Sequence, residues 1–198
     1  MERKRVFIAI NLPEEIKNAI ISKQEEIKKI FHSLGKNFDP VRWTKKENLH
    51  ITIEFLGYLR DKEIEKVGEI IAEVSSNIPP LKITLTNICY VLEKEKIPRM
   101  IWVKGEKSDI LSKMKINLDK KLEKEIGFKP EKREFTPHIT LGRIRKWQFK
   151  AIPLEERPEI EKDIDLMFKV SSIELMESKL KPTGAEYFIL KSFPLSSK

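Results

Sequence analysis

His50-Ile51-Thr52-Ile53 recurs later in the chain as His138-Ile139-Thr140-Leu141. Each copy alternates polar and apolar residues, which is typical of a strand with one face against a core. His and Thr therefore point to one side of each strand, and the apolar residues point to the other. The chain has three histidines, and two of them open nearly identical tetrapeptides. This repetition indicates an internal duplication.

Similar elements surround the two copies. Residues 6–11 predict a strand, and Pro13 at a first helical position introduces apolar residues at helical spacing. Residues 100–103 also predict a strand, which is followed by a helix that begins at Ser108 and ends at Gly127. The order of strand, helix and histidine strand therefore runs over residues 6–58 and again over residues 100–144.

The rest of the chain supplies further strands and one more helix. The expected elements are a strand at 41–44, a helix that Asp61 caps and that ends before Pro79, a strand at 81–90, a charged loop at 93–96, and two strands around 166–178 and 185–193. Because strands and helices do not alternate as a parallel series, the sequence predicts an α+β fold. We expect a bilobal molecule whose two pseudo-symmetric lobes have antiparallel sheets flanked by helices and face a central cleft. Residues 1–198 would form one such domain, with the motifs at 50–53 and 138–141.

Two imidazoles and two hydroxyls on facing strands suit chemistry at phosphorus. In-line displacement needs one group to remove a proton and another to supply one, and the charged equatorial oxygens need hydrogen-bond donors. His50 and His138 can fill the first two roles, and Thr52 and Thr140 the others. Such a pair predicts a bell-shaped pH profile centred near neutrality.

The histidines also have other possible roles. A single histidine on a half-buried strand is more often a packing residue, and the duplication is what favours catalysis. His32 has no such counterpart and is interpreted as a cation near a helix C-terminus, without a function. A metal centre is the main chemical alternative, but catalytic zinc usually has three protein ligands. Neither motif has a carboxylate or Cys on the matching face, Glu54 being the nearest, so no metal is predicted.

Composition favours a cytoplasmic protein with an anionic partner. The net charge is +8, with 39 Lys and Arg against 31 Asp and Glu, although many of these charges form mixed runs typical of solvated helix faces. Cys89 is the only cysteine, so no intrachain disulfide can form. The apolar stretch at 6–10 is too short for a signal peptide or a membrane span. We therefore expect no membrane association.

The paired motifs resemble the signature of the two-histidine phosphoesterase superfamily. Further stretches are similar to its RNA 2',3'-cyclic phosphodiesterase branch, which was first described as 2'-5' RNA ligase. These stretches are Phe7-Ile8-Ala9-Ile10-Asn11-Leu12-Pro13, Val41-Arg42-Trp43, Glu47-Asn48-Leu49-His50-Ile51-Thr52, Phe55-Leu56-Gly57, Pro98-Arg99-Met100-Ile101-Trp102, Phe135-Thr136-Pro137-His138-Ile139-Thr140-Leu141 and the region of Ser178, Gly184 and Tyr187.

The resemblance implies hydrolysis of an RNA terminal 2',3'-cyclic phosphate to a 2'-phosphomonoester without a cofactor. By residue match, His50 would be the proton donor and His138 the proton acceptor, while Thr52 and Thr140 would contact the phosphate. Arg143 would either add a phosphate contact or be a solvated side chain at a strand end. The partner would be RNA with a cyclic-phosphate end, and we expect a monomer.

Two other functions stay open from the sequence. One is ATP-independent 2'-5' RNA ligation as the main role, and the other is non-catalytic binding of RNA ends. Residues 91–97 differ from the Gly- and Phe-containing loop that many relatives have at this place. How far a bound substrate extends toward this loop therefore stays open. Four aromatic residues could stack a terminal base or simply belong to the core: Trp43, Phe55, Trp102 and Phe135.

Overall fold

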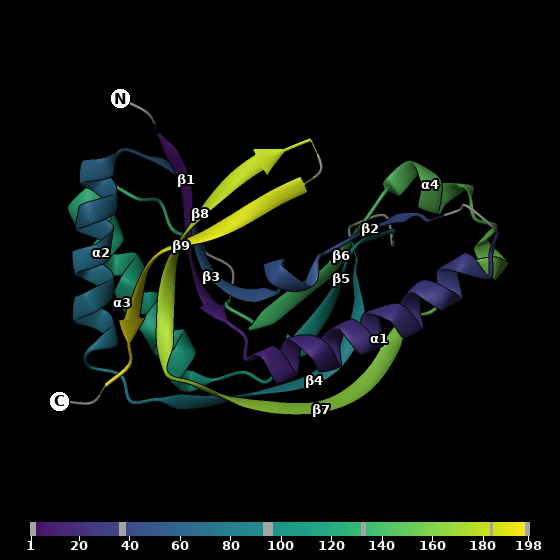
Figure 1. Ribbon diagram of the computed structural model, residues 1–198, viewed down its shortest axis with the longest axis horizontal. Coiled ribbons are helices and arrows are strands. Elements are labelled where there is room, and N and C mark those ends of the chain that lie inside the picture. The colour runs from purple at the N-terminus through teal and green to yellow at the C-terminus, as the bar shows by residue number, and fades with distance from the viewer. Residues whose placement is uncertain (1–2, 36–38, 93–96, 132–133, 183, 197–198) are drawn as a thin grey trace.

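The chain folds into helices packed around antiparallel strands (Figure 1). The computed structural model describes residues 3–35, 39–92, 97–131, 134–182 and 184–196. The strands are β1 (Lys4–Asn11), β2 (Val41–Trp43), β3 (His50–Leu59), β4 (Leu81–Leu92), β5 (Pro98–Gly105), β6 (His138–Ile144), β7 (Glu161–Val170), β8 (Ser172–Lys181) and β9 (Gly184–Pro194). The helices are α1 (Glu14–His32), α2 (Asp61–Ser75), α3 (Asp109–Ile126) and α4 (Lys146–Ala151), with short 3₁₀ turns η1 (Lys46–Asn48) and η2 (Leu154–Glu156). The expected α+β class with antiparallel pairing is confirmed.

The described strands form one sheet with two halves, which are joined by the pairing of β3 with β6. Their order is β7-β4-β5-β6-β3-β1-β8-β9, with β2 paired to β6. We call β3, β1, β8 and β9 the β1 half, and β7, β4, β5, β6 and β2 the β5 half. The halves meet where β3 and β6 pair at Ile51 and Ile139. The two motif strands are therefore the seam between the halves.

The helices are exchanged between the halves. Helix α1 follows β1 in sequence, but its Gln24 amide donates to the Leu141 carbonyl of β6 at 3.1 Å and to the Thr44 carbonyl at 2.9 Å. Helix α3 follows β5, but its Lys115 is paired with Glu54 of β3. In Figure 1, α3 stands beside α2 at one end of the molecule and α1 lies along the other. Helices α1 and α3 therefore each pack on the half that does not contain the strand preceding them in the sequence.

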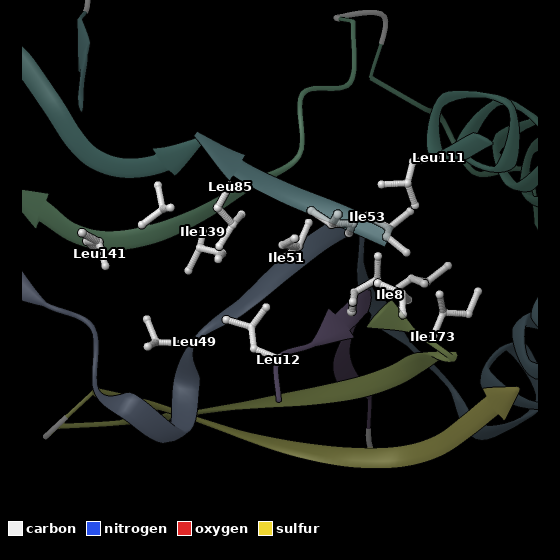
Figure 2. Close-up of a cluster of buried hydrophobic side chains, with 14 of the residues drawn as sticks. Ile8, Leu12, Leu49, Ile51, Ile53, Leu85, Leu111, Ile139, Leu141 and Ile173 are labelled. Carbon is white, nitrogen blue, oxygen red and sulfur yellow. The ribbon is translucent and has the colours of Figure 1, made fainter. Parts of the chain in front are cut away.

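The apolar faces of the motif strands lie in the core. Ile51 and Ile139 are fully buried, and Figure 2 shows them among side chains from several strands and from α3. This core holds the backbone of both motifs from behind, because the period of a strand places His and Thr on the opposite face. A Cβ at Gly142 would lie 2.5 Å from Val41, so glycine allows β2 to pair closely with β6 beside the motif.

Three of these local predictions are confirmed and one is wrong. The Ser108 hydroxyl accepts from the Leu111 amide at 3.3 Å, Gly127 ends α3 with φ 65°, and α1 ends at His32. Asp61 is the first residue of α2 rather than its cap, because the Glu63 carboxylate accepts the Arg60 amide at 2.7 Å and fixes the helix start one residue earlier. The connection after β6 also contains α4, which was not predicted. The expected loop at 93–96 lies outside the described residues.

The predicted strand around 166–178 is two strands. Strand β7 pairs with β4, whereas β8 pairs with β1, so the chain crosses from one half to the other at Ser171. The buried apolar residues change phase at this point, from Phe168 and Val170 to Ile173 and Leu175. A single strand cannot bury both sets on one face.

Candidate active site

The two motifs line one small cavity. Antiparallel pairing centred on Ile51 and Ile139 brings His50 and Thr52 beside His138 and Thr140. All four side chains line a cavity of about 60 Å³, which we call the motif cavity. Its other lining residues are Thr44, Asn48, Phe55, Arg143 and Tyr187. The structure therefore brings together every site residue that the sequence predicted.

A bulge in β3 adds Phe55 to this cavity. Thr52 pairs with Ala9 and Glu54 pairs with Ile8, which leaves Ile53 as an extra residue in the ladder. Beyond this bulge the alternation of faces is reversed. Glu54 consequently points into the core toward Lys115, and Phe55 lies on the same side as the histidines with 57% of its surface exposed.

Both imidazoles are held by the same type of hydrogen bond. Nδ1 of His50 donates to the Asn48 carbonyl at 2.8 Å, and Nδ1 of His138 donates to the Thr136 carbonyl at 2.8 Å. A carbonyl oxygen can only accept, so the proton of each neutral ring resides on Nδ1. Nε2 is then the atom that exchanges protons. In His50 this atom also contacts the Thr52 hydroxyl at 2.9 Å.

The rings have different aromatic neighbours. His50 lies 5.1 Å from the ring of Phe7 and 5.1 Å from that of Tyr187, which meets it edge-on at 88°. His138 is stacked on Trp102, with ring centroids 3.6 Å apart and an interplanar angle of 20°. The two halves of the site are therefore alike in backbone geometry and different in the environment of the imidazole.

Burial favours the neutral form of both histidines. It lowers the pKa of His50 to about 4, against the effect of the Asn48 carbonyl, and the charges of His138 and Lys17 lower this pKa further. Burial also lowers the pKa of His138, while the Thr136 carbonyl opposes that shift. In the free protein near neutral pH, both imidazoles are therefore mostly neutral, and each can accept a proton at Nε2.

A larger basic groove continues from the motif cavity. It has a volume of about 770 Å³ and shares Thr44, Asn48, Phe55, Arg143 and Tyr187 with the motif cavity. Its basic lining residues are Arg5, Arg42, Lys45, Arg143 and Lys181, and its described lining contains no acidic residue. On one side, Arg42 and Arg143 lie directly opposite each other on β2 and β6. Like charges in such a pair repel, so this arrangement favours an anion between them.

The β8–β9 hairpin lines part of the groove. The Asn48 amide donates to the Ala185 carbonyl at 2.8 Å, and Gly184 lies close to the Arg42 guanidinium. These contacts connect the tip of the hairpin in the β1 half with the β5 half. Figure 1 shows the hairpin extending toward β2.

The four candidate aromatic residues have separate positions. Phe55 lines the motif cavity, Trp43 lines the basic groove, and Trp102 stacks on His138. Phe135 packs against the core. Asn48 was not predicted from the sequence as a site residue, although its position two residues before His50 matches that of Thr136 before His138. This repeated spacing was the signal that could have identified both carbonyl acceptors.

The described residues contain no group of three or more His, Cys, Asp or Glu side chains arranged to hold a metal ion. None of the helices in the described ranges is long and apolar enough to cross a membrane.

Known proteins resemble this chain over almost its full length. A family model described as LigT like Phosphoesterase matches residues 10–102 and 106–187, and each range contains one motif. An RNA 2',3'-cyclic phosphodiesterase of Methanocaldococcus jannaschii is 35% identical over 190 residues, which cover 96% of this chain and 99% of that protein. An RNA 2',3'-cyclic phosphodiesterase of Thermotoga maritima is 32% identical over 190 residues, covering 94% and 92%.

Solved structures share the fold over the full chain. A protein of Thermus thermophilus superposes with a TM-score of 0.80 at 25% identity, covering 98% of this chain and 99% of that one. Escherichia coli LigT complexed with 3'-AMP superposes with a TM-score of 0.73 at 23% identity, with coverage of 98% and 99%. From the family match and the near-complete coverage of these relatives, the chain belongs to the LigT-like phosphoesterases of the two-histidine superfamily.

Proposed function

We propose that this protein hydrolyses the 2',3'-cyclic phosphate at the end of an RNA and leaves a 2'-phosphate. The observation that carries the proposal is the convergence of His50 and His138 on one cavity with two threonine hydroxyls. Relatives at 35% and 32% identity that bear the name RNA 2',3'-cyclic phosphodiesterase support the same substrate.

The proposed reaction is an in-line displacement at phosphorus. Nε2 of His138 takes a proton from water, the water oxygen forms a bond to phosphorus, and the bond from phosphorus to the 3' oxygen breaks. His50 gives its Nε2 proton to the departing 3' oxygen. The two Nδ1 hydrogen bonds keep both Nε2 atoms available for this exchange.

Hydroxyl and guanidinium groups would hold the phosphate. Thr52 and Thr140 can donate to its non-bridging oxygens, where negative charge increases as the water oxygen adds. Thr52 now contacts Nε2 of His50, so a bound phosphate would compete for this hydroxyl. Arg143 lines both cavities and lies opposite Arg42, which favours a phosphate contact over a purely solvated side chain.

The basic groove supports RNA rather than a free nucleotide as the substrate. A single strand has a phosphate at each step, and a groove with basic and aromatic side chains suits both its backbone and its bases. Trp43, Phe55 and Tyr187 supply the aromatic faces in this groove. The expected cytoplasmic location, monomeric state, single bilobal domain and absence of a cofactor stay predictions.

One turnover assay separates this function from its alternatives. We expect the purified protein, treated with a chelator, to open a 2',3'-cyclic-phosphate oligonucleotide catalytically without ATP. Binding of the oligonucleotide without turnover would instead support an RNA-end binding protein. Rapid joining of added 5'-hydroxyl RNA, with hydrolysis slower than ligation, would support a ligase as the main role.

The pH dependence follows from the lowered histidine pKa values. The productive free enzyme has a proton on His50 and none on Nε2 of His138. Because both pKa values lie below the usual 6.5, the population of this form is greatest below pH 6.5. It then falls about tenfold per pH unit on the alkaline side. We expect kcat/KM to have its maximum in the acidic range rather than near neutrality.

The bound substrate should shift this profile. A phosphate anion beside the rings favours the imidazolium form, so the alkaline limb of kcat should lie at higher pH than that of kcat/KM. Initial rates at constant ionic strength across the acidic and neutral range would measure both limbs. A kcat/KM maximum on the alkaline side of neutrality would contradict the assignment.

The basic groove predicts a salt-dependent preference for longer substrates. Arg42→Gln should lower kcat/KM for a cyclic-phosphate oligonucleotide and reduce its log–log salt slope by about 0.7, the value for one contact with a single strand. The mononucleotide cyclic phosphate should be affected much less. Lys82→Gln is the matched control, because Lys82 is an exposed cation of β4 outside both cavities. Equal effects of the two variants would exclude the groove as the RNA path.

A further inference from the structure

The two halves of the site differ most at the faces of the histidine rings. The indole of Trp102 lies parallel to the imidazole of His138, within 3.6 Å and 20°. Trp102 is in β5 and pairs with Thr140 of β6, so the ladder itself places the indole beside the second motif. At His50 the nearest rings are tilted or edge-on at 5.1 Å. Only His138 therefore has an aromatic face stacked on it among the described residues.

We propose that Trp102 is a positioning residue for His138: its indole face fixes the plane of the imidazole and stabilises the imidazolium that forms when His138 takes a proton from water. The face of an indole carries negative charge density and attracts a cation placed over it. The attraction is weak for a neutral ring and strong for a charged one. It therefore grows as the base becomes protonated, which is the condition for lowering the barrier.

The surrounding charges make this aromatic face important. The titratable groups near His138 are Lys104, its partner on β5, with His50, Arg143 and Tyr187, which line the same cavity. The first three are cations or can become cations, so they disfavour protonation of His138. Burial disfavours it as well. On the favourable side are the Thr136 carbonyl and the Trp102 face. The asymmetry also gives a physical reason for the roles, because an aromatic face suits the group that gains a proton.

Packing alone is a poor explanation for tryptophan at this position. The indole Nε1 is buried and has no hydrogen-bond partner among the described residues. A buried donor without a partner is unfavourable, and phenylalanine would fill much of the space without one. The contrast with Trp43 is informative, because the Nε1 of Trp43 donates to Asp39 at 3.1 Å.

The electrostatic role can be tested with tryptophan analogues at position 102. Fluorine atoms withdraw charge from the indole face with little change of shape, so a series with increasing fluorination should progressively lower the pKa of His138. Proton NMR can follow this titration directly, because the chain has three histidines. The titration of the other two histidines should stay unchanged along the series, and kcat for a cyclic mononucleotide should fall together with the pKa of His138.

Phenylalanine provides the simpler variant. Trp102→Phe should lower kcat by about 2- to 30-fold, the range that a cation–π contact supports, with little change in KM. Its thermal stability should stay close to that of the wild type. The variant loses part of the indole's packing volume, but it also loses a buried N–H that has no hydrogen-bond partner among the described residues. Trp147→Phe is the control, since Trp147 is 73% exposed on α4 and lies outside the site.

The kinetic part of this inference rests on the proposed function, but the titration does not. If the wild type fails to turn over cyclic phosphates while the His138 pKa still follows fluorination, the proposed function fails and the role of Trp102 stands. If the His138 pKa is the same in every analogue, the proposal is overturned, whatever the rates. A fall in kcat without a change in this pKa would also overturn it, because that is the result of a purely structural role.

Discussion

Replacing either motif histidine with alanine is expected to lower kcat for a 2',3'-cyclic phosphate by about 10²–10⁴-fold, the usual contribution of one acid or base. Both residues line the motif cavity and both keep Nε2 available for proton exchange. Because the attacking water and the departing oxygen each need a partner in the same step, neither histidine can replace the other. Initial rates at saturating substrate measure the effect.

The controls for this prediction separate chemistry from folding. His32→Ala, at the end of α1, should retain full activity. His50→Asn and His138→Asn can keep a donor to the Asn48 or Thr136 carbonyl while lacking an imidazole, and they should be as inactive as the alanine variants. The double variant should be little worse than the poorer single one, because the two residues act as a unit. Near wild-type turnover in either single variant would refute the paired mechanism.

Lys115→Met is expected to lower the free energy of unfolding by about 3–5 kcal/mol at neutral pH. The ammonium group of Lys115 is buried between Glu54 of β3 and Asp119 of α3, which it contacts at 2.8 Å. Burial by itself would lower the pKa of Lys115, but its hydrogen bonds to Asp119 and Glu54 raise it. Without this cation, the Glu54 carboxylate is left buried without its countercharge.

The loss should depend on pH in a defined direction. Burial already raises the pKa of Glu54, and removal of Lys115 should raise it further. The protonated carboxyl is tolerated in the core, so the deficit relative to the wild type should be small below the wild-type pKa of Glu54 and should grow as pH rises above it. Urea unfolding at several pH values would measure it. Lys113→Met, an exposed position on the same helix, should cost less than about 0.5 kcal/mol. A Lys115→Met deficit that is equally small would contradict the role of this ion pair.

The sequence predicts most of the elements and the core of the site for a clear physical reason. A strand has a strict period of two, so the His-x-Thr pattern fixes which side chains share a face. The chain also contains the caps that begin and end α3, since Ser108 and Gly127 act locally. Predictions of this kind depend only on neighbours along the chain.

The features that sequence reasoning missed depend on neighbours in space. The bulge at Ile53 sends Phe55 to the site and Glu54 to the core, and it arises from the pairing of β3 with β1. The exchange of α1 and α3 between the halves is likewise set by tertiary contacts such as Gln24 with Leu141. The stacking of Trp102 on His138 follows from the register of β5 and β6. The duplication of the domain and the roles of the site residues stay predictions.

The most direct test of the proposed function is the position of the phosphate after hydrolysis. His50 is assigned to the departing 3' oxygen and His138 to the water on the opposite side, so the site must hold the ring in one orientation. A cyclic-phosphate oligonucleotide would be digested with the wild-type protein, and its terminal nucleotide would be compared by chromatography with 2'- and 3'-phosphate standards. We expect the 2'-phosphate as the only product, and a predominant 3'-phosphate would contradict the roles assigned to His50 and His138.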